Sequence, residues 1–375
     1  MKIEMMEFLS DKIDDIDLLK DVIETLDNMS LDDRMKTFNE LKKYRYNKFV
    51  CSIAVDSDVL SERTIEDRIK LMEELKKCDY NDNAYKLATD INVLRKRTNE
   101  DQIKLMEELK KCDYNDNAYK LATDIDVLSI RTNEDQIKLM EELKKCDYDD
   151  NAYKLATHVS VLIRKRNEEQ IKLMEALKSC YYIENAYQLA RNINVLRERS
   201  VEEQIKLMEE LKKCDYNDNA YKLAIYKFVL EERTNEEQIK LMEELKNCGY
   251  NDNAYKLATD KFVLEERTNE EQIKLMEELK KCDYNVNAYQ LVIDKFVLNE
   301  RTNEEQIKLK KMAHTKSKQQ KLINHSYNME EISDVTEFKM YLNELKQELG
   351  KDTDVKSDTV VLKFTPDKNK ERKEN

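Results

Sequence analysis

Apolar residues recur along this chain with the spacing of one face of a helix, and polar residues lie between them. In one representative stretch, Ile239, Met242, Leu245 and Cys248 lie three residues apart. This period predicts an amphipathic α-helix and not a strand. The residues between them are mostly Glu and Lys, which suits a face exposed to water. The stretch is therefore predicted to be a helix with one buried stripe.

Residues that cap and terminate helices mark the ends of this stretch. Thr234 and Glu237 form a capping box, in which the hydroxyl and the carboxylate each satisfy a free backbone N–H. The residues Gly-Tyr-Asn-Asp after Cys248 are typical of a turn, so the helix is expected to end near that cysteine. A shorter second helix is predicted from about Asn253. Residues 260–267 are predicted to form a tight turn or a short third helical segment.

The same pattern repeats every 34 residues. Eight copies run without insertions from Ser30 to Arg301, and a ninth begins at Thr302 and breaks off. The recurring cysteines show the spacing: Cys78, Cys112, Cys146, Cys180, Cys214, Cys248 and Cys282. A fixed period of this length is the signature of a solenoid, in which each unit packs on its neighbours. We therefore predict an all-α, right-handed α-solenoid of helix-turn-helix repeats with helical caps.

In period and hairpin layout, the unit resembles the tetratricopeptide repeat, which is also a helix–turn–helix of 34 residues. The tetratricopeptide signature is absent, because the chain has no tryptophan and no proline closing the unit. Segments reading VLxxRTNEEQIKLM are also similar to tandem repeats of uncharacterised bacterial proteins. Both resemblances imply an α-solenoid. Neither implies an activity or assigns a functional residue.

The chain divides into four segments of different character. Residues 1–29 are predicted to be an N-terminal helical cap, and residues 30–312 the solenoid. Residues 313–350 are predicted to form a basic linker and an amphipathic C-terminal helix, because apolar residues from 332 to 349 keep helical spacing. Residues 351–375 are charged and mostly unpatterned, which predicts a disordered tail.

The formal net charge of −13 bears on the class of partner. An acidic surface repels phosphate backbones, which disfavours nucleic acid and favours basic or neutral partners. One stretch runs against this balance, because Lys308 to Lys321 contains six lysines and no acidic residue. It leaves nucleic-acid binding open as an alternative function. It could equally be a solvated helix that pairs with the acidic repeats.

The sequence predicts a cytoplasmic protein without catalytic activity. No segment approaches eighteen uninterrupted apolar residues, so no membrane span is expected. The eight cysteines include no CxxC pair, and we interpret the periodic ones as small buried apolar groups. A glycine-rich phosphate loop, a nucleophile elbow and an HExxH motif are all absent. We therefore predict no catalytic residue, no cofactor and no metal site.

The copies agree in their first helix and differ just before the next capping box. At one position there, the first five copies carry Asp58, Asn92, Asp126, Ser160 and Asn194. The last three carry a phenylalanine preceded by a lysine, and these six residues are called the Lys-Phe column: Lys227, Phe228, Lys261, Phe262, Lys295 and Phe296. The column is predicted to contact a protein or peptide through aromatic burial, with the lysines steering an acidic segment. Alternatively, the phenylalanines are core or partial core, filling the space for which earlier copies use Ile91, Ile125 and Ile193 one position earlier.

Two further residue types recur in every regular copy. The second tyrosine of each pair, such as Tyr119, is predicted to pack in the core. Asparagines such as Asn83 and Asn117 are predicted to cap the second helix. Neither series requires a ligand. The function predicted by the sequence is thus a non-catalytic protein–protein interaction scaffold.

Overall fold

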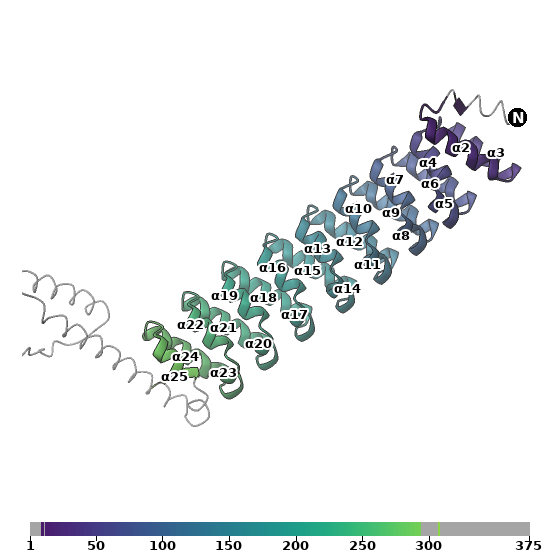
Figure 1. The fold of residues 1–375 in the computed structure, drawn as a ribbon. Coiled ribbons are helices and arrows are strands. Elements are labelled where there is room, and N and C mark those ends of the chain that lie inside the picture. The colour runs from purple at the N-terminus through teal and green to yellow at the C-terminus, as the bar shows by residue number, and fades with distance from the viewer. Residues whose placement is uncertain (1–8, 11, 294–306, 308–375) are drawn as a thin grey trace, which may run out of the picture. The chain divides into compact units, whose positions relative to one another are not determined.

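The computed structural model describes residues 9–10, 12–293 and 307. The chain divides into two units, residues 1–311 and 312–375, and all described residues belong to the first. Lys295 and Phe296 lie outside the described residues. So do the ninth copy apart from Ile307, the basic 308–321 stretch and the segments 313–350 and 351–375. Every regular element within the described residues is a helix (Figure 1).

Each repeat contains a long first helix, a shorter second helix and a short third helix. The first helices are α3 (Leu31–Lys43), α6 (Ile65–Lys77), α9 (Asn99–Lys111), α12 (Asn133–Lys145), α15 (Asn167–Ser179), α18 (Val201–Lys213), α21 (Asn235–Asn247) and α24 (Asn269–Lys281). The second helices are α4 (Lys48–Val55), α7 (Asp82–Thr89), α10 (Asp116–Thr123), α13 (Asp150–Thr157), α16 (Glu184–Arg191), α19 (Asp218–Ile225), α22 (Asp252–Thr259) and α25 (Val286–Ile293). The third helices are α5 (Ser57–Glu62), α8 (Ile91–Lys96), α11 (Ile125–Ile130), α14 (Val159–Arg164), α17 (Ile193–Glu198), α20 (Lys227–Glu232) and α23 (Lys261–Glu266).

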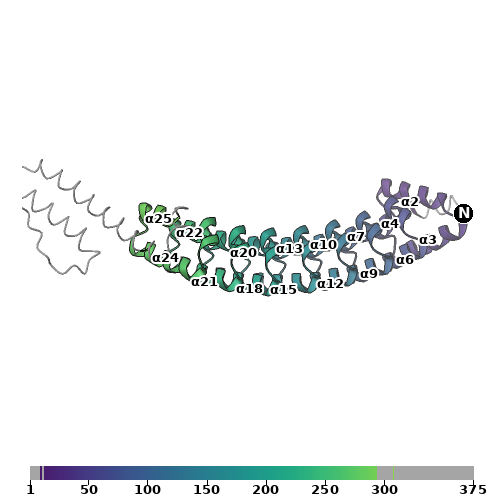
Figure 2. The same ribbon diagram turned by 90° about the horizontal axis from the view of Figure 1, so that it is seen from below.

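Helices of the same kind stack on one another from repeat to repeat. Helix α6 packs on α9, α7 on α10 and α8 on α11, and the same contacts recur along the chain. In Figure 2 the labelled first helices line one side of the row, and the labelled second helices line the other. Before the first repeat, α2 (Ile16–Asn28) packs against α3 and α4. The described repeats therefore form an all-α solenoid, as predicted.

Capping residues start the first helices where the sequence indicates. The Thr234 N–H donates to Glu237 Oε2 at 2.9 Å, and the Glu237 N–H donates to Thr234 Oγ1 at 3.3 Å. In the third copy, the shorter Asp101 accepts from the Thr98 hydroxyl at 2.9 Å, and the Asp101 N–H donates back to that hydroxyl oxygen at 3.1 Å. Both arrangements satisfy backbone donors of the first turn.

The turn between the first and second helices ties neighbouring repeats together. Two residues there have positive φ, such as Asp113 at 50° and Tyr114 at 54°. Asn115 caps α10 through its side chain, so the prediction that Asn117 is the cap is wrong. Asn117 Nδ2 instead donates to the Tyr148 carbonyl of the next repeat at 2.9 Å. The second-helix asparagines therefore fix the stacking of repeats.

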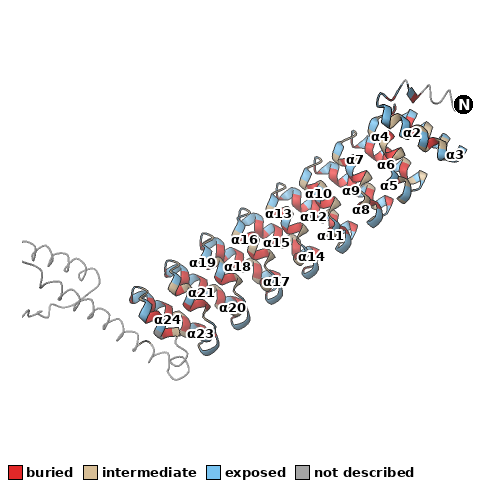
Figure 3. Ribbon diagram, viewed as in Figure 1, coloured by how far each residue is buried: buried red, intermediate tan, exposed pale blue. Residues whose placement is uncertain are grey.

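The core is built from the same small set of residues in each copy (Figure 3). In the third copy, Leu105, Met106, Leu109 and Cys112 are fully buried. All eight cysteines are free thiols and buried, which confirms their interpretation as apolar core groups. Burying such side chains contributes about 1.5–3 kcal/mol each for the larger ones. The core columns thus account for the regularity of the first-helix sequence.

A second set of buried residues, the Arg-Gln seam, was missed by the sequence analysis. In this seam, the arginine that ends one copy bonds to a glutamine in the first helix two copies later. Arg97, at the end of the second copy, and Gln136, in α12 of the fourth copy, are one example. Gln136 is fully buried, and its Nε2 donates to the carbonyls of Leu121 and Ala122 at 3.0 and 2.9 Å. Its Oε1 accepts from Arg97 Nη2 at 3.1 Å. The recurrence of arginine at the end of most copies was the available signal.

Candidate partner-binding surface

The segment that varies most between copies forms the column of third helices. From α8 onward, each described third helix buries a Val-Leu pair, and in α11 Val127 and Leu128 are 0% and 3% exposed. The first two residues of each third helix lie outside this buried pair. We call these positions the third-helix edge, which in α11 comprises Ile125 and Asp126. The positions that distinguish the copies therefore lie along one edge of the stack.

Within the Lys-Phe column, the two described phenylalanines differ in burial. Phe228 is half-buried and packs against the core, and its ring lies edge-on to Tyr226 with centroids 5.8 Å apart. Phe262 is 39% exposed. Lys261 Nζ lies 5.1 Å from the centroid of the Phe228 ring, which is cation–π geometry between neighbouring repeats. The column thus combines partial core packing with exposed aromatic surface.

The lysines of this column also have acidic neighbours on their own helices. Lys227 Nζ lies 3.5 Å from Glu231 Oε1, and Lys261 Nζ lies 3.5 Å from Glu265 Oε1. Both lysine side chains remain at least half exposed, at 56% and 50%. Their charges are therefore accessible from solvent but are locally balanced.

The edge is aliphatic in earlier copies. Ile125, Val159 and Ile193 each begin a third helix and are 45%, 42% and 46% exposed. Ile163 in α14 is 69% exposed. The hypothesis that Ile125 and Ile193 occupy the core is therefore wrong. At this position the later copies carry Lys227 and Lys261, and the exposed apolar residue lies one position later, at Phe262.

A contact between His158 and Arg191 interrupts the regular pattern where the fourth and fifth copies meet. His158 stands where other copies place a capping aspartate, and Arg191 Nη1 lies 3.3 Å from His158 Nε2. The Arg191 guanidinium lies 5.0 Å from the centroid of the Tyr187 ring. Burial first, and the charge of Arg191 second, lower the pKa of His158. The neutral imidazole is thus the favoured form of His158 beside this cation.

The buried thiols are unsuited to nucleophilic chemistry. Burial raises the pKa of Cys146 and of Cys248 to about 11, which disfavours the reactive thiolate. Among the described residues, no group of three or more His, Cys, Asp or Glu side chains could hold a metal ion. No helix in that part of the chain is long and apolar enough to cross a membrane.

No protein-family model, no curated protein and no solved structure matches the chain. The class of protein therefore rests on the fold alone. The stacked helices define an all-α helical-repeat protein with regular packing between neighbours.

Proposed function

We propose that this chain is a non-catalytic protein–protein interaction scaffold whose contact surface is the third-helix edge. One observation carries the proposal: large apolar side chains are exposed at the first or second position of several third helices, where the copies differ. Ile125, Val159, Ile193 and Phe262 are between 39% and 46% exposed. Contiguous exposed apolar surface marks interaction sites on soluble proteins. A solenoid presents such positions at regular spacing to an extended partner.

The partner we propose is a protein or peptide that buries aromatic and aliphatic side chains of this edge. Phe262 supplies an exposed ring, and aromatic residues are enriched among the residues that dominate binding energy. Lys227 and Lys261 retain exposed ammonium groups that would attract an acidic segment of the partner. The remaining members of the column, Lys295 and Phe296, lie outside the described residues.

The test replaces Phe228, Phe262 and Phe296 together by Asn, the residue found at Asn92 and Asn194. Partners captured from the native host by the unchanged chain are compared with those captured by the variant. We expect the variant to lose the partner with a small fall in melting temperature. A matched variant that changes Ile125 and Ile193 to Asn probes the aliphatic half of the edge. A large fall in melting temperature, or full retention of the partner by both variants, contradicts the proposal.

We further propose that the protein is cytoplasmic and that its unit shares the helical-hairpin layout of tetratricopeptide repeats. Free buried thiols support the first proposal, because disulfides are rare in reducing compartments. The hairpin of first and second helices supports the second, and the third helix distinguishes this unit. Nucleic-acid binding through Lys308 to Lys321 stays a prediction, because that stretch lies outside the described residues.

A further inference from the structure

Near the end of the first helix, a lysine bridges two glutamates in the first copy. Lys43 Nζ lies 3.3 Å from Glu40 Oε2 on its own helix and 3.1 Å from Glu73 Oε1 on the first helix of the next repeat. We call this arrangement the glutamate clamp. It places one ammonium group between carboxylates from two neighbouring repeats.

The own-helix half of the clamp, a lysine paired with the glutamate three residues before it, recurs in later copies with that glutamate more deeply buried. The lysine–glutamate distances are 2.9 Å for Lys77 and Glu74, 2.9 Å for Lys111 and Glu108, 2.9 Å for Lys145 and Glu142, and 2.8 Å for Lys213 and Glu210. Each of these four glutamates is 2% exposed. The glutamate of the next repeat adds a weaker attraction, as Glu107 does for Lys77. A nearly buried carboxylate thus has an ammonium partner in each of these copies.

The fifth copy shows that the two charges are lost together. Ala176 stands in place of the buried glutamate, and Ser179 stands in place of the lysine. The Ser179 hydroxyl donates to the Ala176 carbonyl at 2.7 Å, so the substituted pair is satisfied without any charge. This is the expected outcome, because a buried charge that loses its partner is strongly destabilising.

The seventh copy departs from both patterns, since it keeps the glutamate and lacks the lysine. Asn247 occupies the lysine position, and its Nδ2 donates to Glu244 Oε2 at 3.1 Å. The Cys248 thiol donates to Glu244 Oε1 at 3.6 Å. Glu244 is 8% exposed, and within the described residues it has no ion-pair partner. Two neutral donors therefore stand where other copies have an ammonium group.

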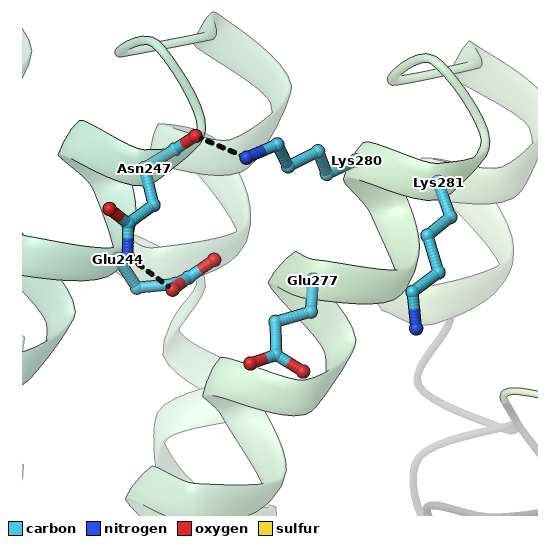
Figure 4. Close-up of a pocket in the computed structure, with 5 residues that line it drawn as sticks. All are labelled: Glu244, Asn247, Glu277, Lys280 and Lys281. Carbon is cyan, nitrogen blue, oxygen red and sulfur yellow. Dashed lines mark hydrogen bonds between the residues drawn. The ribbon is translucent and has the colours of Figure 1, made fainter.

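A hollow lies between α21 and α24, with Asn247 in its wall. Its lining residues are Glu244, Asn247, Glu277, Lys280 and Lys281. Figure 4 shows Glu244 and Asn247 on one side of the hollow and Glu277 on the other. Lys280 Nζ donates to the Asn247 carbonyl at 2.6 Å, and Lys281 Nζ pairs with Glu278 at 2.7 Å. Both lysines that line the hollow are thus bonded to other groups.

We propose that this hollow binds the ammonium group of a lysine side chain carried by a partner protein. Glu244 and Glu277 correspond to Glu40 and Glu73, the two carboxylates that hold Lys43 in the first copy, and the first copy is thus the precedent for an ammonium ligand between them. A partner's lysine would supply the cation that Asn247 does not. This inference rests on the proposed scaffold function in one respect, namely that the partner is a protein. The hollow lies at the ends of the first helices and contains no residue of the third-helix edge.

The test uses n-butylammonium chloride as a mimic of the lysine side chain. The chain has two glycines, Gly249 and Gly350, and Gly249 lies two residues after Asn247. Protein labelled with ¹⁵N only at glycine therefore gives one reporter signal beside the hollow and one distant in sequence. We expect butylammonium to shift the Gly249 signal along a saturating curve and to leave the Gly350 signal in place. Butanol and sodium butyrate, matched in chain length, should produce no saturating shift.

Two variants separate binding in the hollow from other effects. Asn247→Lys restores the clamp of the other copies, and we expect it to abolish the Gly249 response. The double substitution Lys213→Asn with Asp215→Gly transfers the hollow to the sixth copy, and we expect a third glycine signal that also responds. No saturating shift of Gly249, or a shift that persists in Asn247→Lys, overturns the proposal. A response to Mg²⁺ without one to butylammonium would overturn it as well, because the hollow would then be a metal site. If the hollow responds while the phenylalanine variant keeps its partner, only the third-helix edge is refuted.

Discussion

The Arg-Gln seam differs between two regions of the solenoid. We call residues 64–157 the regular region and residues 158–204 the irregular region. In the regular region, Arg97 Nη1 donates to the Leu128 carbonyl at 3.0 Å, and Nη2 donates to the Arg131 carbonyl at 2.9 Å. Its Nη2 and Nε also reach Gln136 Oε1. In the irregular region, Lys165 makes one bond, from Nζ to the Arg199 carbonyl at 3.2 Å. A lysine has no planar fork with which to reach several acceptors at once.

In the irregular region, the seam glutamine Gln204 forms different hydrogen bonds from those of Gln136. Gln204 Nε2 donates to the Val195 and Arg199 carbonyls at 3.2 and 3.1 Å. Its Oε1 is buried without a hydrogen-bond partner. The same region also lacks side-chain caps at α14 and α16, which begin after His158 and Ile183. In the regular region Asp124 and Asn115 cap the equivalent helices α11 and α10.

This difference separates two roles within the repeat. Helices α14, α15 and α16 have the same lengths as α11, α12 and α10 despite the missing contacts, so the apolar columns are sufficient to set the helices. The seam and the caps instead satisfy backbone groups between repeats. Their loss leaves polar atoms unpaired, and each such atom costs about 1–3 kcal/mol when buried. The irregular region is therefore expected to be the weaker part of the stack.

The largest effect is expected from breaking the intact seam with Arg97→Met. The change leaves the carbonyls of Leu128 and Arg131 and the oxygen of Gln136 without their donor. Because hydrogen bonds to a charged group contribute about 1.5–3 kcal/mol, we expect a loss of about 3 kcal/mol or more. Urea unfolding and hydrogen exchange of the α11 and α12 amides measure it.

Arg95→Met is the matched control for this change. Arg95 lies in α8, two residues before Arg97, and its Nε is 3.2 Å from Glu62 Oε1, with the arginine side chain 64% exposed. Exposed ion pairs contribute about 0–1 kcal/mol. Equal losses of stability in Arg95→Met and Arg97→Met would show that the seam has no special role.

The next effect comes from repairing the irregular seam with Lys165→Arg. The guanidinium would supply the donor that Gln204 Oε1 lacks, once the amide has turned to the orientation of Gln136. We expect a gain of about 1–2 kcal/mol, read as a higher urea midpoint and slower exchange in α17 and α18. The reverse change, Arg97→Lys, should lower stability by a similar amount. A loss of stability in Lys165→Arg would mean that the lysine is the better fit there.

The sequence predicted the features that depend on local pattern. The 34-residue period, the first-helix caps such as Thr234, the buried cysteines and the stacked helices were all predictable, because each follows from spacing or propensity. The roles of Asn117, Arg97 and Gln136 were not, since their partners lie in neighbouring repeats. The exposure of individual apolar side chains could not be predicted from the pattern either, so Ile125 could be assigned to the edge or to the core. A residue that is the same in every copy must have a structural role, but the sequence does not show which neighbouring residue it contacts.

A smaller gain is expected from adding a cap with Ile183→Asn. Ile183 precedes α16 without a side-chain cap and is 40% exposed. Asparagine at this position caps α10 through Asn115, so the substitution copies a native arrangement. Replacing an uncapped residue by a capping one stabilises by about 1 kcal/mol. Asn115→Ile should cost a similar amount, and thermal unfolding that leaves both variants unchanged would contradict the role of these caps.

The smallest effect concerns the pH dependence of His158. Its pKa is lowered by burial and then by Arg191, and its Nδ1 is buried without a hydrogen-bond partner. The unfolded chain, with an ordinary histidine pKa of about 6.5, therefore takes up the proton more readily than the folded chain. By linkage, the stability that the neutral imidazole contributes is present above the unfolded pKa and is lost as the pH falls through the folded pKa.

The variant His158→Asn removes the titrating group and supplies the cap that Asn192 provides for α17. We expect the urea midpoint of the unchanged chain to fall more steeply than that of the variant between pH 7 and pH 5. Carboxylates titrate in both proteins, and so do the two histidines outside the described residues, so the difference between the curves reports His158. Parallel curves would mean that the proton on His158 is equally stable in the folded and unfolded chains. The irregular region would then owe its weakness to Lys165 and the missing caps, with no contribution from the histidine.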